Sequence, residues 1–91
     1  MMAIRRRPAV NQFSIRMEER LRRHDDRLGW ETCSSWWLFQ RMQMEFGEAL
    51  EAIFNKRGSE QVANECADAA NFLMMVADNA LRREFTDERG E

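Results

Sequence analysis

The chain has 91 residues, with 14 Lys and Arg against 16 Asp and Glu, and a formal net charge of −2. A chain of this length forms one domain with a small core, and its charge gives no global reason to bind nucleic acid or a membrane surface. The composition is 44% hydrophobic and 33% charged with a single proline, which is typical of an ordered helical protein and excludes a disordered one.

The cysteines and the apolar stretches indicate the cellular compartment of the protein. Cys33 and Cys66 form no CxxC motif, and the chain begins with no signal-peptide pattern. Both features favour free thiols in a cytoplasmic protein. The longest apolar stretch, around 72–77, is far too short to span a bilayer, so no membrane partner is expected.

The first predicted element is an amphipathic helix. Residues 1–8 (MMAIRRRP) are expected to be a basic tail that ends at its proline. From about 10 to 24, Phe13, Met17 and Leu21 recur every four residues among charged neighbours, which is the apolar stripe of a helix.

A second helix is expected from about 34 to 56. Gly29 breaks the preceding pattern, and Thr32 or Ser34 is suited to cap the new helix. One face of this helix carries four apolar residues and an acid in the same row: Leu38, Met42, Glu45, Ala49 and Ile53.

A third helix is expected from about 60 to 84, with Gly58 closing the second helix and Ser59 as the new N-cap. Two rows of side chains run along it. The first is a heptad-like seam of Val62, Cys66, Ala69, Leu73, Val76 and Ala80, and the second holds Gln61, Glu65, Asp68, Phe72, Met75 and Asn79. A helix with apolar residues on nearly every side is expected to be buried on nearly every side.

The predicted architecture is therefore all-α. It is an antiparallel helix hairpin with an N-terminal helix packed across it, in one domain over residues 1–91 that ends in a frayed tail at 85–91. Short helical chains often complete their core by dimerisation.

Two acid pairs are the main candidate site. Glu45/Glu48 and Glu65/Asp68 share the same spacing of three residues, which puts each pair on one helix face. In an antiparallel hairpin the two pairs would face each other, and four clustered carboxylates take up protons or bind a cation. Oxygen ligands select Mg²⁺ or Mn²⁺ over zinc. A di-iron site would need Glu-x-x-His elements, and the only histidine, His24, lies outside the pairs.

A plainer interpretation makes these residues surface acids in ion pairs along a helix. It fits Glu45 poorly, because Glu45 lies in the apolar row, and it fits Asp68 poorly, because alanines flank Asp68. An ExxE motif alone is uninformative, but ExxE followed by ExxD on two helices joined by a tight turn is more specific.

The stretches EFGEAL at 45–50 and ECADAANFLMMVADNA at 65–80 resemble the paired motif of the MazG-like all-α NTP pyrophosphatases, especially small phage or mobile-cassette members. The segment 17–30 is similar to the lead-in helix of that subgroup. It departs from the subgroup at His24, where an asparagine is usual, at Arg27, where a lysine is usual, and at 28–30, where Leu-Gly-Trp replaces Gly-Gly-Trp. These departures bear on base or sugar selectivity more than on the chemistry.

The resemblance implies a magnesium-dependent enzyme that cleaves a nucleoside triphosphate between the α- and β-phosphates, releasing a monophosphate and pyrophosphate. It also implies a homodimer or a dimer of dimers, with a four-helix-bundle-like core. In this resemblance all four acids, Glu45, Glu48, Glu65 and Asp68, hold Mg²⁺, with Mn²⁺ as a substitute. Glu48 is also expected to orient the attacking water, while the other three mainly bind the metal.

The remaining substrate candidates come from faces and loops near the acids. Asn79 lies three turns beyond Asp68 on nearly the same face, while Asn71 is turned away from that line and ranks lower. Trp30 follows Gly29 on a loop and is expected either to stack on a base or to pack as a lid. The others are Phe72 as a pocket wall or core residue, Arg27 and Lys56 as phosphate contacts or solvated charges, and His24 as a substrate contact or a surface residue.

Two other functions compete with the enzyme. In the first, the chain is a non-catalytic helical dimerisation module whose acids pair with arginines of the first helix or of a partner chain. In the second, the basic tail binds nucleic acid, which we do not expect because acidic seams repel phosphate and the tail is short.

Overall fold

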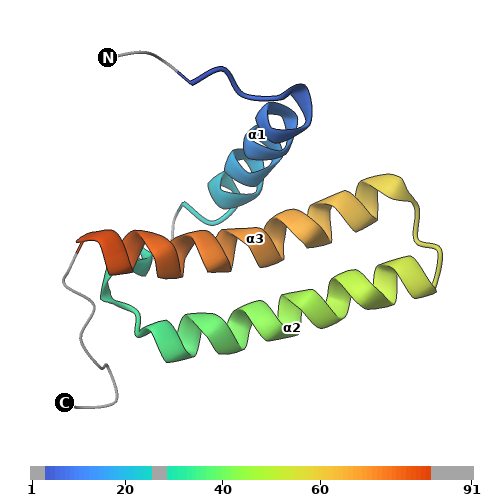
Figure 1. Cartoon of the computed structure of the whole chain (residues 1–91). Helices are drawn as coiled ribbons and strands as arrows, with labels where there is room; N and C mark the ends of the chain where they lie inside the picture. Colours follow the sequence, from blue (N-terminus) through green and yellow to red (C-terminus); the bar gives the residue numbers. More distant parts are fainter. Residues whose placement is uncertain (1–3, 26–28, 83–91) are drawn as a thin grey trace.

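The computed structural model describes residues 4–25 and 29–82. These residues form helices joined by short links, and they contain no strand (Figure 1). The elements are α1 (Pro8–Arg22), a 3₁₀ turn η1 (Trp30–Thr32), α2 (Ser35–Phe54) and α3 (Ser59–Arg82). The prediction of an all-α fold is confirmed. The predicted tail at 85–91 lies outside the described residues.

The helix α3 is the central element. Helices α2 and α3 run antiparallel as a hairpin, and α1 lies across the other side of α3 (Figure 1). Within the described residues α3 packs against α2, α1 and η1, whereas α1 does not pack against α2. No helix in this part of the chain is long and apolar enough to cross a membrane.

The first helix begins earlier than the sequence pattern predicts. Pro8 is its first residue instead of the end of the tail. Proline is favoured at this position, because the first N–H of a helix has no partner within the helix, so its loss costs nothing. The proline ring also holds φ near the helical value. Phe13, Met17 and Leu21 form the half-buried side of α1, as their spacing predicts.

Of the two predicted caps for α2, Ser34 is the one used. Its Oγ accepts a hydrogen bond from the backbone N–H of Trp37 at 3.1 Å, while Thr32 belongs to η1. This bond satisfies one of the donors that every helix start leaves unpaired.

The turn between α2 and α3 differs by one or two residues from the prediction. Helix α2 ends at Phe54, and Lys56 takes a left-handed conformation with φ 52°. Gly58, with φ 95°, accepts the first bond of α3 from the backbone N–H of Val62 at 3.1 Å. Ser59 is therefore the first helical residue and not the N-cap, and glycine suits the cap because φ is positive there.

The hydrophobic core of one protomer is small. Among the described residues its buried apolar members are Leu38, Ala49, Ala52 and Ala67. Two residues assigned to the predicted seams are instead open to solvent, because Ile53 is 56% and Leu73 is 44% exposed. The alanines allow α2 and α3 to approach closely, since the distance between packed helices depends on the side chains at the contact.

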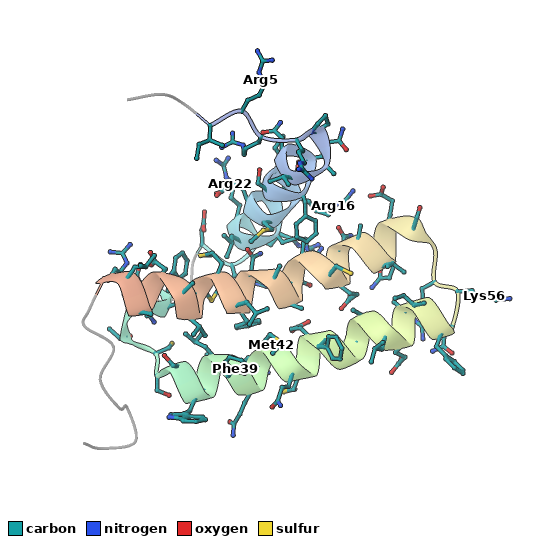
Figure 2. The ribbon with its side chains drawn as sticks, viewed as in Figure 1. Arg5, Arg16, Arg22, Phe39, Met42 and Lys56 are labelled. Carbon is teal, nitrogen blue, oxygen red and sulfur yellow. The ribbon has the colours of Figure 1, made fainter. Side chains whose placement is uncertain are left out.

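One side of α2 remains uncovered in the protomer. Four large side chains with helical spacing, which we call the α2 apolar face, are between 44% and 56% exposed: Phe39, Phe46, Leu50 and Ile53. Phe39 is labelled in Figure 2 on the lower helix. Exposed apolar groups gathered on one face are typical of a surface that packs against another surface.

The cap of α2 provides a test of the fold. Replacing Ser34 with alanine should lower the free energy of unfolding by about 1 kcal/mol and the melting temperature by roughly 4–8 °C. Ser14→Ala is the control, because the Ser14 Oγ only donates to Asn11 O at an exposed position within α1. Equal melting curves for the two variants by circular dichroism would contradict the role of Ser34.

Candidate functional site

Three of the four predicted acids converge between α2 and α3. Glu45 comes from α2, while Glu65 and Asp68 come from α3, and one carboxylate oxygen of each lies within 4.8 Å of the others. Glu45 reaches this place because its side of α2 faces α3, between the half-buried Met42 and the buried Ala49. The spacing therefore predicted correctly that acids of both pairs meet.

Burial and crowding change the protonation of these acids. The pKa of Glu45 is raised to about 7, mainly because the side chain is partly buried. The nearness of Glu48 and the negative charges of Asp68 and Glu65 contribute further. Burial, followed by the nearness of Glu48, also raises the pKa of Glu65. The cluster is therefore short of positive charge, and it favours either a bound proton or a bound cation.

Glu65 also has an oxygen without a partner. Its Oε1 accepts a hydrogen bond from Gln61 Nε2 at 2.7 Å, whereas its Oε2 is buried and accepts no hydrogen bond from any residue that the structure describes. A buried acceptor without a donor is unfavourable. This atom is therefore suited to bind a cation.

Glu48 lies beside the cluster rather than within it. The structure groups Glu45, Glu65 and Asp68 without Glu48, although Glu48 is near enough to raise the pKa of both other glutamates. The Glu48 side chain is exposed and lines a smaller depression of about 230 Å³ together with Glu65.

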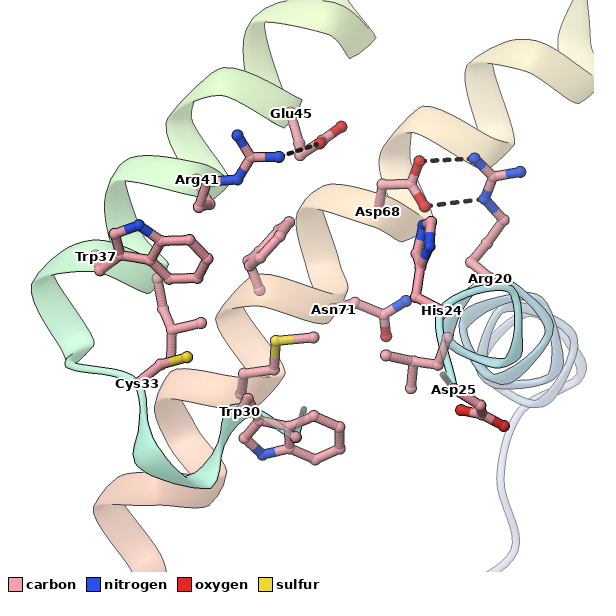
Figure 3. A pocket seen from close by; sticks show the side chains of 15 residues that line it. Arg20, His24, Asp25, Trp30, Cys33, Trp37, Arg41, Glu45, Asp68 and Asn71 are labelled. Atoms are coloured by element: carbon pink, nitrogen blue, oxygen red, sulfur yellow. Dashed lines mark hydrogen bonds and ion pairs between the residues drawn. The ribbon is translucent and has the colours of Figure 1, made fainter. Parts of the chain in front are cut away.

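Two arginines contact the cluster from opposite sides (Figure 3). Arg20 of α1 donates from Nε to Asp68 Oδ1 at 2.9 Å and from Nη2 to Asp68 Oδ2 at 2.8 Å. Arg41 Nη2 lies 3.9 Å from Glu45 Oε1, and its guanidinium lies 5.8 Å from the ring centroid of Phe72. The sequence pattern predicts neither arginine as a site residue, although Arg20 borders the apolar stripe of α1 beside Leu21.

An open cavity of about 630 Å³ begins at the acids and continues toward η1 (Figure 3). It includes three of the predicted substrate residues, His24, Trp30 and Phe72. Its acidic end contains Glu45 and Asp68, and its other end contains Trp30 and Trp37. Carboxylates and aromatic rings thus share one cavity.

The Trp30 side chain is fixed in place. Its indole N–H donates to Asp78 Oδ2 at 2.9 Å. The amide of Asn79 donates to the carbonyl oxygen of Trp30 at 3.1 Å and to that of Cys33 at 3.4 Å. Trp30 therefore forms a wall of the cavity, and hydrogen bonds attach both its ring and its backbone to the end of α3.

Asn71 and Asn79 of α3 change places relative to the prediction. Asn79 is 1% exposed and is not among the residues that line the cavity, and its amide anchors η1. Asn71 lines the cavity, is 4% exposed and donates to the Met17 carbonyl at 3.0 Å. Its Oδ1 is buried and has no hydrogen-bond partner among residues 4–25 and 29–82. The only sequence signal for Asn71 was its place three residues after Asp68.

Of the two predicted phosphate contacts, the one that the structure describes is not brought to the acids. Lys56 lies exposed at the hairpin turn, away from the cavity (Figure 2). Arg27 lies outside the described residues.

The raised pKa of Glu45 predicts a pH-dependent stability. The folded protein holds this proton more tightly than the unfolded chain, whose glutamate has its ordinary pKa of 4.5. The contribution of this proton to the free energy of unfolding is therefore complete below pH 4.5 and is lost as the pH rises through about 7. Without divalent cations the melting temperature should fall across this window, and Glu45→Gln should flatten the fall. A wild-type protein and a Glu45→Gln variant with parallel melting profiles from pH 5 to 8 would contradict this.

Comparison of the chain with protein-family models, with curated proteins and with solved structures found no significant match in any of the three. A possible function therefore has to be argued from the acid spacing, the geometry of the cluster and the cavity beside it.

Proposed function

We propose that the protein is a Mg²⁺-dependent nucleoside triphosphate pyrophosphohydrolase. The observation that carries this proposal is the convergence of Glu45, Glu65 and Asp68 from two helices at one end of a cavity with aromatic walls. The resemblance to MazG-like enzymes supplies the reaction, and the cluster supplies a place where a hard cation would be held.

The donor set fits a magnesium ion. All candidate ligand atoms are carboxylate oxygens, the ligands that Mg²⁺ and Mn²⁺ prefer. The free Oε2 of Glu65 and the raised pKa of Glu45 both indicate a site that lacks positive charge. A bound Mg²⁺ would supply phosphate charge neutralisation and a lowered pKa for a nearby water.

Each acid has a distinct role in this proposal. Glu45, Glu65 and Asp68 hold the cation, and Glu48, exposed beside them, orients the attacking water and accepts its proton. The water oxygen forms a bond to the α-phosphorus while the bond from that phosphorus to the bridging oxygen breaks. The products are a nucleoside monophosphate and pyrophosphate.

The cavity has the size and lining that a nucleotide requires. Its volume of about 630 Å³ lies within the range of small-molecule sites. The acids at one end suit a polyphosphate with its cation, and the held Trp30 ring suits a base. His24 and Phe72 line the space between them.

We also propose that the protein works as a homodimer or a dimer of dimers. The protomer buries few apolar side chains and leaves Phe39, Phe46, Leu50 and Ile53 exposed. A second copy packed on the α2 apolar face would complete a four-helix core.

The competing function is a non-catalytic dimerisation module, and specific contacts favour it as second candidate. Arg20 pairs with Asp68, and Arg16 pairs with Glu60 at 3.0 Å. Acids that pair with arginines of the first helix are what this module predicts. The module leaves unexplained why the buried Oε2 of Glu65 has no partner in the described part of the chain.

A nucleotide panel distinguishes the two functions. With Mg²⁺ and canonical ribo- and deoxynucleoside triphosphates, the wild type should release pyrophosphate, and Glu65→Gln should lower kcat/KM at least about 100-fold, because it removes the charge that holds the cation. Glu18→Gln is the control, since Glu18 is an exposed acid of α1 that pairs with Arg22 at 3.1 Å. No turnover of any nucleotide, with an unchanged melting temperature on adding Mg²⁺, would rule out the enzyme.

The oligomer has its own test. Phe46→Glu should shift the protein toward monomer in sedimentation velocity experiments, because the substitution places a charge on the α2 apolar face. Ile15→Glu alters an equally exposed apolar residue of α1, 52% against 56% for Phe46, and should leave the oligomer intact. Identical sedimentation of both variants and the wild type would argue against an interface on this face.

A further inference from the structure

The pair formed by Arg20 and Asp68 links α1 to the acid cluster. Both oxygens of Asp68 accept a hydrogen bond from one guanidinium, at 2.9 and 2.8 Å. The side chains of Arg20 and Asp68 are 20% and 23% exposed, so the pair is partly shielded from solvent. Such two-bond contacts are the strongest form of an arginine–carboxylate pair.

This pair and a bound cation compete for the same carboxylate. Asp68 is one of the three acids whose oxygens lie close enough together to hold an ion. A divalent cation at these oxygens would lie near the positive guanidinium of Arg20, and like charges at such distances repel one another. The cation and Arg20 therefore each weaken the hold of the other on Asp68.

Arg20 also lies where a polyphosphate would lie. Its side chain lines the cavity that contains Glu45 and Asp68 (Figure 3). A guanidinium released from Asp68 would therefore have this cavity beside it. The fork of N–H donors that fits a carboxylate fits phosphate oxygens equally well.

We propose that Arg20 neutralises Asp68 while no cation is bound, and that it moves from Asp68 to the phosphate groups of the substrate when the cation binds. The proposal rests on the proposed function. It assigns to α1 a phosphate-binding residue that also responds to the metal.

Arg20 could instead be only a structural link between α1 and α3. The two roles predict opposite effects on cation binding in the absence of nucleotide. A structural link predicts that loss of Arg20 loosens the site and weakens cation binding, or leaves it unchanged. The exchange predicts that loss of Arg20 strengthens cation binding, because a competing positive charge has been removed.

The test measures Mn²⁺ affinity without nucleotide, by electron paramagnetic resonance of free Mn²⁺. Arg20→Gln should bind Mn²⁺ roughly five times more tightly than the wild type. In saturating Mn²⁺ the same variant should bind a non-hydrolysable α,β-methylene nucleoside triphosphate roughly ten times more weakly. Arg20→Lys keeps the charge without the two-bond fork and should fall between the two proteins in both measurements.

The matched control is Arg22→Gln on the same helix. Arg22 pairs with Glu18, and both side chains are exposed, 71% and 58%. It does not line the cavity, so both affinities should equal those of the wild type.

A second measurement uses the wild type alone and so does not depend on how the variants fold. In ¹⁵N-labelled protein the Nε–H resonance of Arg20 should shift when Mg²⁺ is added, and shift again when the nucleotide analogue follows. A resonance that stays in place while Mg²⁺ binds would overturn the exchange, as would wild-type or weaker Mn²⁺ affinity in folded Arg20→Gln. Failure of the wild type to bind Mn²⁺ or Mg²⁺ at all would instead remove the proposed function, and the exchange with it.

Discussion

The repulsion among the three carboxylates between α2 and α3 is the constraint on which the rest of this structure depends. Each neighbouring feature offsets part of it. Glu45 retains a proton up to about pH 7, and Asp68 is paired with Arg20, while Arg41 lies near Glu45. None of these satisfies the buried Oε2 of Glu65. Within the described part of the chain, the cluster therefore has an incomplete set of positive partners.

One of the bonds that attach α1 to α3 involves the same cluster. Helix α1 contacts α3 and not α2 within the described residues, and polar bonds connect the two. Arg16 donates to Asn64 at 2.8 Å, Arg20 to Asp68, and Asn71 to the backbone of Met17. Such bonds are directional and sensitive to the charge around them. A change in the charge of the cluster is therefore expected to change how firmly Arg20 attaches α1 to α3.

Features that depend on local spacing were predictable from the sequence. The three helices and the meeting of Glu45 with Glu65 and Asp68 follow from helical periodicity and a tight turn, and the sequence narrowed the cap of α2 to Thr32 or Ser34. Features that depend on tertiary neighbours were not. The pairing of Arg20, the exposure of Ile53 and the different surroundings of Asn71 and Asn79 depend on which element lies opposite each face. The chain's own pattern does not specify that element.

The anchoring of η1 separates two parts of the cavity. Asp78 and Asn79 hold the aromatic end, while Glu45, Glu65 and Asp68 form the acidic end. The aromatic wall thus depends on a different stretch of α3 from the stretch that carries the acids. Substitutions in η1 or in the last turns of α3 can change which molecules fit without altering the carboxylates. In evolutionary terms, the aromatic end of this cavity can diversify while the acid cluster is kept.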